Sequence, residues 1–362
     1  MVAEILFFLC LFPIVLYGIF LLRLGKGWLS HPVFEEKPTP YSIAVSIVVC
    51  ARNESTHIQQ LLTCLSAQSY MHKEIIVVDD GSTDGTANIV LTFPHVKLVL
   101  LSEGVGKKKA LRKGIESATG EFIVCTDADC TMGTAWLETL VQCFDRQRPD
   151  MIIAPVRMSY NKTLFQRMQA VEFMSLTAST AGAALIEHPI MCNGANLSFT
   201  KKAWSNSSDN LMDKFVSGDD MFLMESIKRQ GGKIVYIKSE KALVTTLPNP
   251  TLPVFFQQRR RWISKSSGYT DREIQFTALL VVFSTTIPLL FLLFGFFNSH
   301  FFLLGLILWI IKSSMDWTFL HLFRSFFSIP LSLSIFLPLA ILYPFYLMLT
   351  MILGKMKKVV WE

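Results

Sequence analysis

Charged residues are scarce in this sequence of 362 residues: they make up 17% of it, whereas hydrophobic residues make up 51%. The long apolar runs gather at the two ends of the chain, and most of the charges lie between them. Such a distribution excludes an ordinary water-soluble protein, because uncharged runs of this length are typical of membrane spans. The sequence therefore predicts a membrane protein with a soluble middle region.

Cysteines are also few, and their arrangement excludes a disulfide framework. The seven cysteines are odd in number and scattered, and no two of them form a Cys-x-x-Cys pair. This pattern is typical of thiols that are kept reduced, as they are in the cytosol.

The first apolar run, residues 5–22, lacks the features of a cleaved signal peptide. No basic segment precedes it, and no small-x-small cleavage site follows it. At about 1.5 Å per helical residue, the run nearly spans a hydrocarbon core that is about 30 Å thick. Arg23 and Lys26 follow it, and the positive-inside rule then places the middle of the chain in the cytosol. We expect an N-terminal transmembrane anchor over residues 1–25.

The C-terminal region, residues 276–354, is expected to hold two to three transmembrane helices. Residues 277–297 and 331–353 are uncharged, and each run is long enough to span. Between them, the shorter apolar run 301–311 is interrupted by Lys312 and Asp316. This run either lies at the membrane interface or, as we favour, spans with its two charges facing protein.

A third C-terminal span creates a conflict of topology. Three spans after a cytosolic domain would place Lys355, Lys357 and Lys358 outside, against the positive-inside rule. An interfacial segment in place of the middle span would remove this conflict.

The soluble middle, residues 41–250, alternates short β-branched runs with helical periods. The first four runs cover residues 46–50, 74–78, 96–101 and 122–125, and each is followed by a polar cluster. Alternating strands and helices predict an α/β domain with a mostly parallel sheet, whose ligand site lies at the carboxyl ends of its strands. Independent turns would not be expected to collect acidic and basic groups on one rim.

Asp127 and Asp129 follow the fourth run. On an extended chain alternate side chains point the same way, so the two carboxylates can face one ligand while Ala128 faces the other side. Two oxygen donors suit Mg²⁺ or Mn²⁺, which is usually held by one or two carboxylates and substrate phosphates. The alternative is a solvated turn that only caps the following helix.

Five further polar motifs accompany this pair. They are Ala51-Arg52-Asn53-Glu54, Asp79-Asp80-Gly81-Ser82-Thr83-Asp84, Gly106-Lys107-Lys108-Lys109-Ala110-Leu111, Gly218-Asp219-Asp220, and Gln258-x-x-Arg261-Trp262. In this order, the motifs resemble those of family-2 glycosyltransferases with the GT-A fold, a Rossmann-like domain with a mostly parallel sheet. The likeness runs from about Ser46 to Trp262, and the last motif, on an interfacial segment over residues 251–275, resembles processive polysaccharide synthases.

The resemblance assigns the nucleotide to the first two motifs. Ala51, Arg52 and Glu54 would belong to the first nucleotide-binding element, and Asp79 and Asp80 to the acidic loop that receives the base and ribose. A carboxylate can accept a hydrogen bond from the imide N–H of uracil, a group that cytosine lacks. The alternative for the acidic loop is an Asx-rich turn.

The resemblance assigns the diphosphate and the metal to the next residues. Lys107 matches the lysine of the family's Gly-Lys-x-x-Ala-Leu motif, and a lysine at a helix N-terminus suits a diphosphate. We expect Lys108 and Lys109 to lie on a solvated face. Asp127 and Asp129 match the family's Asp-x-Asp, in which the second carboxylate binds the metal and the first helps to hold sugar or ribose.

Asp219 falls where the family carries its catalytic base. Many relatives read Glu-Asp at this position, so the assignment stays open between Asp219 and Asp220, and one of them can also cap a helix. In the last motif, Arg261 offers a planar fork to pyrophosphate oxygens and Trp262 a face for a sugar ring, with Gln258 beside them. The alternative is a basic-aromatic helix that only anchors the domain on anionic lipid.

The resemblance implies an inverting transferase, dependent on Mg²⁺ or Mn²⁺, in the plasma (inner) membrane. It would move a sugar from a nucleoside diphosphate donor, UDP-linked, to a lipid or growing glycan at the cytosolic face, with no nucleic-acid partner. A processive polysaccharide synthase, a single-addition enzyme acting on a lipid, and a polyprenyl-phosphate sugar transferase stay open. A non-catalytic scaffold of a glycan export complex is a rival of another class, against which the intact acidic positions argue.

Overall fold

The computed structural model describes residues 2–37, 42–101, 106–160, 163–207 and 219–354. Its contacts divide the chain into two compact units. One unit consists mainly of His31–Tyr160 and Met191–Tyr269 and holds the β-sheets; we call it the sheet unit. The other consists of Met1–Ser30, Asn161–Ile190 and Thr270–Met356 and holds the long apolar helices; we call it the helical unit.

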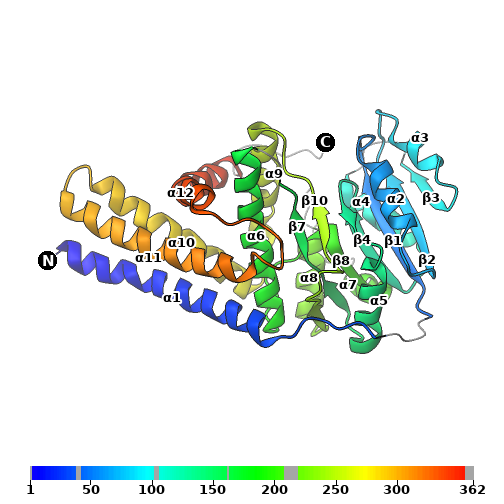
Figure 1. The fold of residues 1–362 in the computed structure, drawn as a ribbon, viewed down its shortest axis with the longest axis horizontal. Coiled ribbons are helices and arrows are strands. Elements are labelled where there is room, and N and C mark those ends of the chain that lie inside the picture. The colour runs from blue at the N-terminus through cyan, green and yellow to red at the C-terminus, as the bar shows by residue number, and fades with distance from the viewer. Residues whose placement is uncertain (1, 38–41, 102–105, 161–162, 208–218, 355–362) are drawn as a thin grey trace. The chain divides into compact units, whose positions relative to one another are not determined.

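Alternating strands and helices build the first half of the sheet unit (Figure 1). In chain order they are β1 (Val45–Ala51), α2 (Ile58–Ser66), β2 (Lys73–Asp79), α3 (Thr86–Leu91), β3 (Val96–Leu100), α4 (Lys107–Glu116), β4 (Phe122–Asp127) and α5 (Trp136–Gln147). Strand β1 pairs in parallel with β2 and β4, and β2 pairs in parallel with β3. This alternation confirms the predicted α/β class with a mostly parallel sheet.

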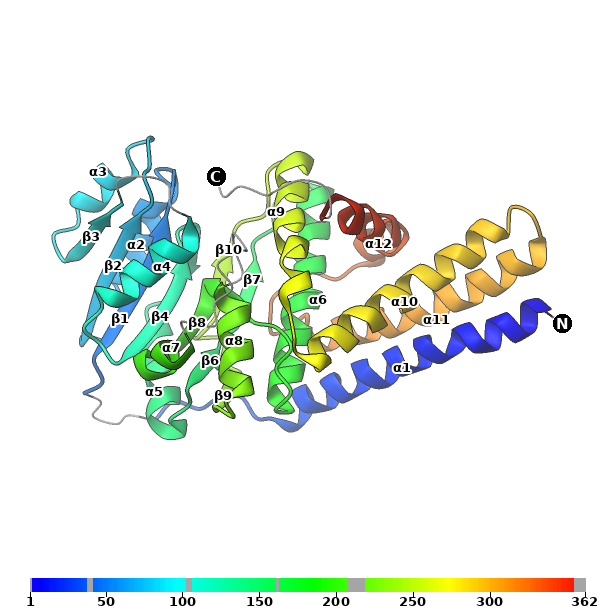
Figure 2. The ribbon, with the colours of Figure 1, turned by 180° about the vertical axis from the view of Figure 1, so that it is seen from behind.

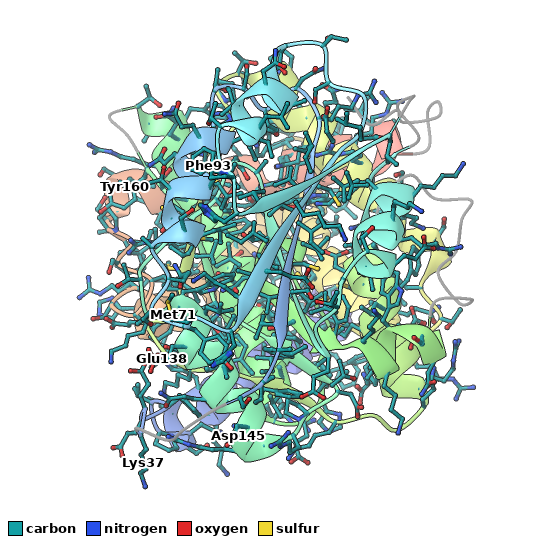
Figure 3. The ribbon with its side chains drawn as sticks, turned by 90° about the vertical axis from the view of Figure 1, so that its right-hand side faces the viewer. Lys37, Met71, Phe93, Glu138, Asp145 and Tyr160 are labelled. Atoms are coloured by element: carbon teal, nitrogen blue, oxygen red, sulfur yellow. The ribbon has the colours of Figure 1, made fainter. Side chains whose placement is uncertain are left out.

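The second half of the unit adds antiparallel pairing. Its elements are β5 (Thr131–Met132), β6 (Met151–Ile153), β7 (Val156–Met158), η1 (Gly194–Asn196), β8 (Leu197–Thr200), α7 (Lys201–Ser207), α8 (Asp219–Arg229), β9 (Ile234–Tyr236), β10 (Val244–Thr246), α9 (Leu252–Ser264) and η3 (Ser266–Gly268). The main sheet has the order β3-β2-β1-β4-β8-β6-β9, and β5, β10 and β7 form a small second sheet. Figure 3 shows the side chains of the structure. Its labels Glu138 and Asp145 identify helix α5, and its label Phe93 identifies the turn that follows α3.

Strand register and close helix packing bring the polar motifs to one rim. Ala51 lies opposite Asp79, and Cys50 lies opposite Asp127, so the carboxyl ends of β1, β2 and β4 coincide. Helix α4 packs tightly on these strands, because a Cβ atom on Gly114 would lie 2.5 Å from Val48 Cγ1. The close packing holds the N-terminus of α4 beside the same rim.

Among its described residues, the helical unit has four helices that are long and apolar enough to cross a membrane. They are α1 (Val2–Ser30), α10 (Arg272–Phe294), α11 (Ser299–Phe323) and α12 (Leu333–Gly354); α1, α11 and α12 pack with α6 (Leu164–Leu185), and α10 packs with α11, α1 and α12. Small residues allow close contact between α1 and α6, since a Cβ atom on Gly27 would lie 2.5 Å from Ile186 Cγ2.

Helix α11 continues through the two charges that interrupt its apolar run. Lys312 Nζ lies 2.6 Å from Asp316 Oδ2, and both side chains are largely buried. The hydroxyl of Tyr17 in α1 donates a hydrogen bond to Asp316 Oδ1 at 2.7 Å. The charges therefore face protein, as we favoured, and the run belongs to a full-length helix.

Helix α12 runs in a different direction from the other long apolar helices. It has 22 residues and α10 has 23, yet α12 is strongly foreshortened where α1, α10 and α11 are seen lengthwise (Figures 1 and 2). Helix α12 therefore runs across the direction of these three helices within the helical unit.

Candidate active site

A cavity of about 170 Å³ opens at the carboxyl ends of β1 and β4. The predicted site residues that line it are Lys107, Asp127, Asp219, Asp220, Gln258, Arg261 and Trp262. Among the described residues, the other predicted ones, Ala51, Arg52, Glu54, Asp79, Asp80 and Asp129, do not line this cavity. The structure thus brings together the residues predicted for the diphosphate and the base, which come from three distant parts of the chain.

Lys107 is the first residue of α4, and it pairs with the end of β4. Its Nζ donates to Asp127 Oδ1 at 2.6 Å. Burial alone would lower the pKa of Lys107, but the Asp127 carboxylate outweighs burial and raises that pKa. Lys107 therefore remains positively charged in the wall of the cavity.

The chain is not extended through the predicted metal pair. Strand β4 ends at Asp127, and Ala128 and Asp129 form a turn, so the predicted alternation of side chains along a strand is wrong here. The hydroxyl of Thr246 in β10 donates to Asp129 Oδ2 at 2.8 Å. The turn, with Thr246 beside it, sets the place of the second carboxylate.

These two carboxylates have the chemistry of a site for a hard divalent cation. Burial, together with the nearby charge of Asp127, raises the pKa of Asp129. A cation would offset both the desolvation and the repulsion. No third His, Cys, Asp or Glu completes a cluster within the part of the chain that the structure describes. The donor set fits Mg²⁺ or Mn²⁺ held jointly with substrate phosphates.

The loops after β1 and β2 are joined by hydrogen bonds into one surface. Asn53, with a left-handed φ of 54°, accepts from the Thr83 N–H at 2.9 Å. Its own N–H donates to Ser82 Oγ at 2.9 Å. Glu54 and Ser55 follow, and the Ser55 N–H donates to Asp84 Oδ2 at 2.9 Å. The two predicted nucleotide elements are therefore neighbours.

The two acidic residues predicted to bind the nucleotide, Asp79 and Asp80, also stabilise the fold. Asp79 and Asp80 are buried. Asp79 Oδ1 accepts from the Ser82 N–H, three residues further on, at 3.2 Å, so this carboxylate holds the turn together. Asp80 Oδ2 accepts from the Gly106 N–H at 3.0 Å and so fixes the entry to α4. Their contact with a nucleotide stays a prediction.

Asp219 and Asp220 open α8 in contrasting environments. Burial and the neighbouring charge of Asp220 raise the pKa of Asp219 to about 6. Burial also acts to raise the pKa of Asp220, but Lys265 and two backbone N–H groups outweigh it and lower that pKa. These N–H groups belong to Met221 and Gly194, at 2.8 Å and 3.1 Å from the carboxylate.

This contrast favours Asp219 as the proton acceptor. Its Oδ1 is buried, and no hydrogen-bond partner for it occurs among the described residues. Asp220 instead ties α8 to the loop before η1, with Lys265 Nζ 3.7 Å from its Oδ1. The first carboxylate can accept a proton, and the second is a fixed anion.

Helix α9 directs its motif into the cavity by helical spacing. Gln258, Arg261, Trp262 and Lys265 lie on one face, three and four residues apart. Gln258 Oε1 accepts from Asn249 Nδ2 at 3.0 Å, which fixes the amide. The alternative of a merely anchoring helix would not require these side chains to face a cavity.

The structure also corrects one expectation and adds residues that sequence reasoning missed. Lys109 is exposed as expected, but Lys108 is not on a solvated face: 11% of its side chain is exposed. Its Nζ lies 4.0 Å from Asp219 Oδ1. Lys265 was missed, although its position seven residues after Gln258 was a signal. Asn193 also lines the cavity, but its loop contains no sequence motif that would have indicated this.

Comparison with known proteins identifies the domain. Residues 46–205 match the family model described as glycosyl transferase family 2. Poly-beta-1,6-N-acetyl-D-glucosamine synthase of Staphylococcus epidermidis is 29% identical over 137 residues, which are 36% of this chain and 33% of that relative. The synthase of the same name from Staphylococcus aureus is 24% identical over 223 residues, 60% of this chain and 53% of that relative. The chain thus spans a third to about half of the length of these relatives.

A solved structure shares the fold. The mannosyltransferase PcManGT from Pyrobaculum calidifontis, in complex with GDP-Man and Mn²⁺, matches with a TM-score of 0.56. The match covers 95% of this chain and 98% of that chain at 18% identity, so it bears on the fold alone. Residues 46–205 therefore match a glycosyl transferase family 2 domain, and the chain has the GT-A fold.

Proposed function

We propose that this chain is an inverting, metal-dependent transferase that moves a sugar from a UDP-linked donor to an acceptor at the cytosolic face of the plasma (inner) membrane. The observation that carries the proposal is the single cavity that Lys107, Asp127, Asp219 and Arg261 line together. Transfer with inversion needs one base opposite the leaving group, and these residues supply a base and cations on separate elements.

The leaving group is the diphosphate, and two cations of the chain face it. Lys107 at the start of α4 and Arg261 in α9 would stabilise the negative charge that develops as the glycosidic bond breaks. Asp129 and Asp127 would hold Mg²⁺ or Mn²⁺, which when bound supplies further positive charge to the diphosphate. Trp262 would stack on the sugar ring, with Gln258 beside it.

Asp219 would act on the acceptor. Its carboxylate takes the proton of the acceptor hydroxyl while the oxygen attacks the anomeric carbon in line. The nucleotide would lie against the joined loops after β1 and β2, with Ala51, Arg52 and Glu54 from the first loop. Burial raises the pKa of Glu54, and the charges of Asp129 and Asp127 act in the same direction. The Glu54 carboxyl is therefore near enough to the two proposed metal ligands to be affected by their charges.

The acceptor is a lipid or a growing glycan. The names of the two staphylococcal relatives favour a polymer of N-acetylglucosamine. The described residues contain only four helices apolar and long enough to span, a small bundle for threading a polymer, and this favours a single addition or transfer to a polyprenyl phosphate. Products labelled with a radioactive sugar and sized on a gel separate the cases: a ladder indicates a polymer and one lipid-soluble band a single addition.

The donor is tested by nucleotide release from membranes that contain the full chain. UDP-N-acetylglucosamine, UDP-glucose and GDP-mannose are supplied in turn with Mn²⁺, and the free nucleoside diphosphate is measured. We expect release from a UDP-sugar that depends on added acceptor lipid. Release from the GDP-sugar alone would overturn the UDP assignment, and no release from any donor would favour the scaffold role.

The direction of α12 suggests a topology without the conflict that the sequence poses. We propose that α1, α10 and α11 cross the membrane and that α12, which runs across them, does not. Lys355, Lys357 and Lys358 then stay on the same side as Arg23 and Lys26, in agreement with the positive-inside rule.

Reporter fusions test this topology. A reporter placed after Lys26 and another at the C-terminus should both report the cytosol. An external signal from the C-terminal fusion would mean that α12 also crosses. An external signal from the first fusion, or glycosylation at the exposed Asn53 in a eukaryotic host, would reverse the whole orientation.

A further inference from the structure

The side chain of Lys108 is turned inward from the first turn of α4. Its Nζ lies 4.0 Å from Asp219 Oδ1 and 5.0 Å from the ring centroid of Phe222 in α8. Only 11% of the lysine side chain and 6% of the aspartate side chain are exposed. Phe222 is itself buried and packs against Tyr269, with 5.5 Å between the ring centroids. The ammonium group is thus held beside the proposed base.

Three consecutive lysines of α4 have three different surroundings. Successive side chains of an α-helix point about 100° apart, so one short segment can reach two separate acids. Lys107 pairs with Asp127 at 2.6 Å, Lys108 faces Asp219, and Lys109 is exposed. Lys109 therefore provides a matched control within the same helix.

The distance between Lys108 and Asp219 has a chemical consequence. At 4.0 Å the two groups attract each other, but no hydrogen bond forms between them, because such bonds are shorter. Asp219 Oδ1 therefore lies near a positive charge, and none of the described residues forms a hydrogen bond with it. A base needs both conditions: it must be ionised, and its oxygen must be open to a proton.

Other charged and titratable groups also surround Asp219. They are Lys107 on α4, Asp220 on α8, Lys265 after α9, Cys50 in β1 and Cys125 in β4, with Asp127 and Arg261 lining the same cavity. Lys107 lowers the pKa of Asp219 more than Lys108 does, and Lys265 lowers it as well, but these two lysines are each paired with another carboxylate, Asp127 and Asp220. The cation paired with Asp219 by distance is Lys108.

We propose that Lys108 is a positioning residue for sugar transfer: held against Phe222, its ammonium keeps the buried Asp219 carboxylate ionised without occupying the oxygen that accepts the proton. The inference rests on the proposed role of Asp219 as the base. A cation within about 4–6 Å lowers a carboxyl pKa by about 1–3 units, so removing the cation raises it. The deprotonated fraction of Asp219 near neutral pH then falls.

The test is the pH profile of kcat for UDP release from UDP-N-acetylglucosamine by the full chain in membranes. In Lys108→Met we expect the acid limb to move to higher pH by about one unit, with the rate recovering toward the wild-type value at alkaline pH. The KM for the donor should stay unchanged. Lys108→Arg should restore the wild-type profile, and Lys109→Met should not shift it.

Two results would overturn the inference. An acid limb for Lys108→Met that coincides with that of Lys109→Met would remove the electrostatic role. An unshifted limb with a raised KM would make Lys108 a donor-binding residue instead. UDP binding, measured on the same membranes, reports whether each variant is folded. Wild-type activity of Asp219→Asn would overturn the proposed base itself, which is a separate failure.

Discussion

Asp219→Asn is expected to lower the transfer rate by roughly a hundredfold or more, the scale of general base catalysis, while UDP binding stays nearly unchanged. The amide fills the same space beside Lys108, but it cannot take a proton from the acceptor hydroxyl. Asp219 is not itself proposed to bind the diphosphate, and the cation paired with it by distance is Lys108, 4.0 Å away. The loss should therefore appear in kcat and not in the affinity for the nucleotide.

The pH dependence of the wild-type enzyme follows from the same group. Burial and the charge of Asp220 raise the pKa of Asp219 to about 6, so the carboxylate is protonated below that pH and ionised above it. The rate should fall as the pH drops through about 6. In Asp219→Asn this limb should disappear from the small residual rate.

Asp220→Asn is the matched comparison. Asp220 accepts bonds from backbone N–H groups and faces Lys265, so its loss should disturb the loop before η1 more than the chemistry. A hundredfold loss in Asp220→Asn with a normal rate in Asp219→Asn would exchange the two roles. Normal rates in both variants would reduce this segment to a helix cap and end the proposed mechanism.

Asp129→Ala is expected to abolish the rescue of activity by metal. Chelation should stop turnover of the wild-type enzyme, and Mn²⁺ or Mg²⁺ should restore it, because the diphosphate leaves with negative charge in a partly dry cleft. The variant lacks the half-buried carboxylate whose pKa is raised by desolvation and by Asp127. Its activity should stay at least about a hundredfold below the wild type at any Mn²⁺ concentration.

A second acidic residue serves as the control for this experiment. Asp145 in α5 pairs with Arg148 at 2.6 Å and does not line the cavity. Asp145→Ala should show the wild-type response to chelation and to Mn²⁺. Binding of Mn²⁺ in the presence of UDP, followed by electron paramagnetic resonance, should weaken only in Asp129→Ala. Full wild-type activity in excess chelator would contradict metal dependence.

Much of the fold followed from local patterns in the sequence. The β-branched runs and helical periods between β1 and α5 are each decided within a few residues, so their order predicts parallel strands and right-handed crossovers. The antiparallel strand β8 was harder to foresee, because the segment before it carries no comparable alternation. Its partner strands lie far away along the chain.

Site residues could be predicted where they belong to a sequence motif. They could not be predicted where contacts with distant residues determine the direction of the side chain. Lys107 at the start of α4 and Arg261 on α9 were recognisable from their motifs, and they line one cavity. The inward turn of Lys108 depends on Phe222, which is distant in sequence. The turn at Asp129 depends likewise on Thr246 in β10. Such contacts are absent from any local pattern.

The most direct test is an experimental structure of the full chain with UDP and Mn²⁺. We predict Mn²⁺ bound by Asp129, the diphosphate between Lys107 and Arg261, and the uracil against the joined loops that contain Asn53 and Asp79. Asp219 should face the open side of the cavity, away from the phosphates. A uracil bound away from these loops, or a diphosphate that contacts neither Lys107 nor Arg261, would contradict the proposed reaction site.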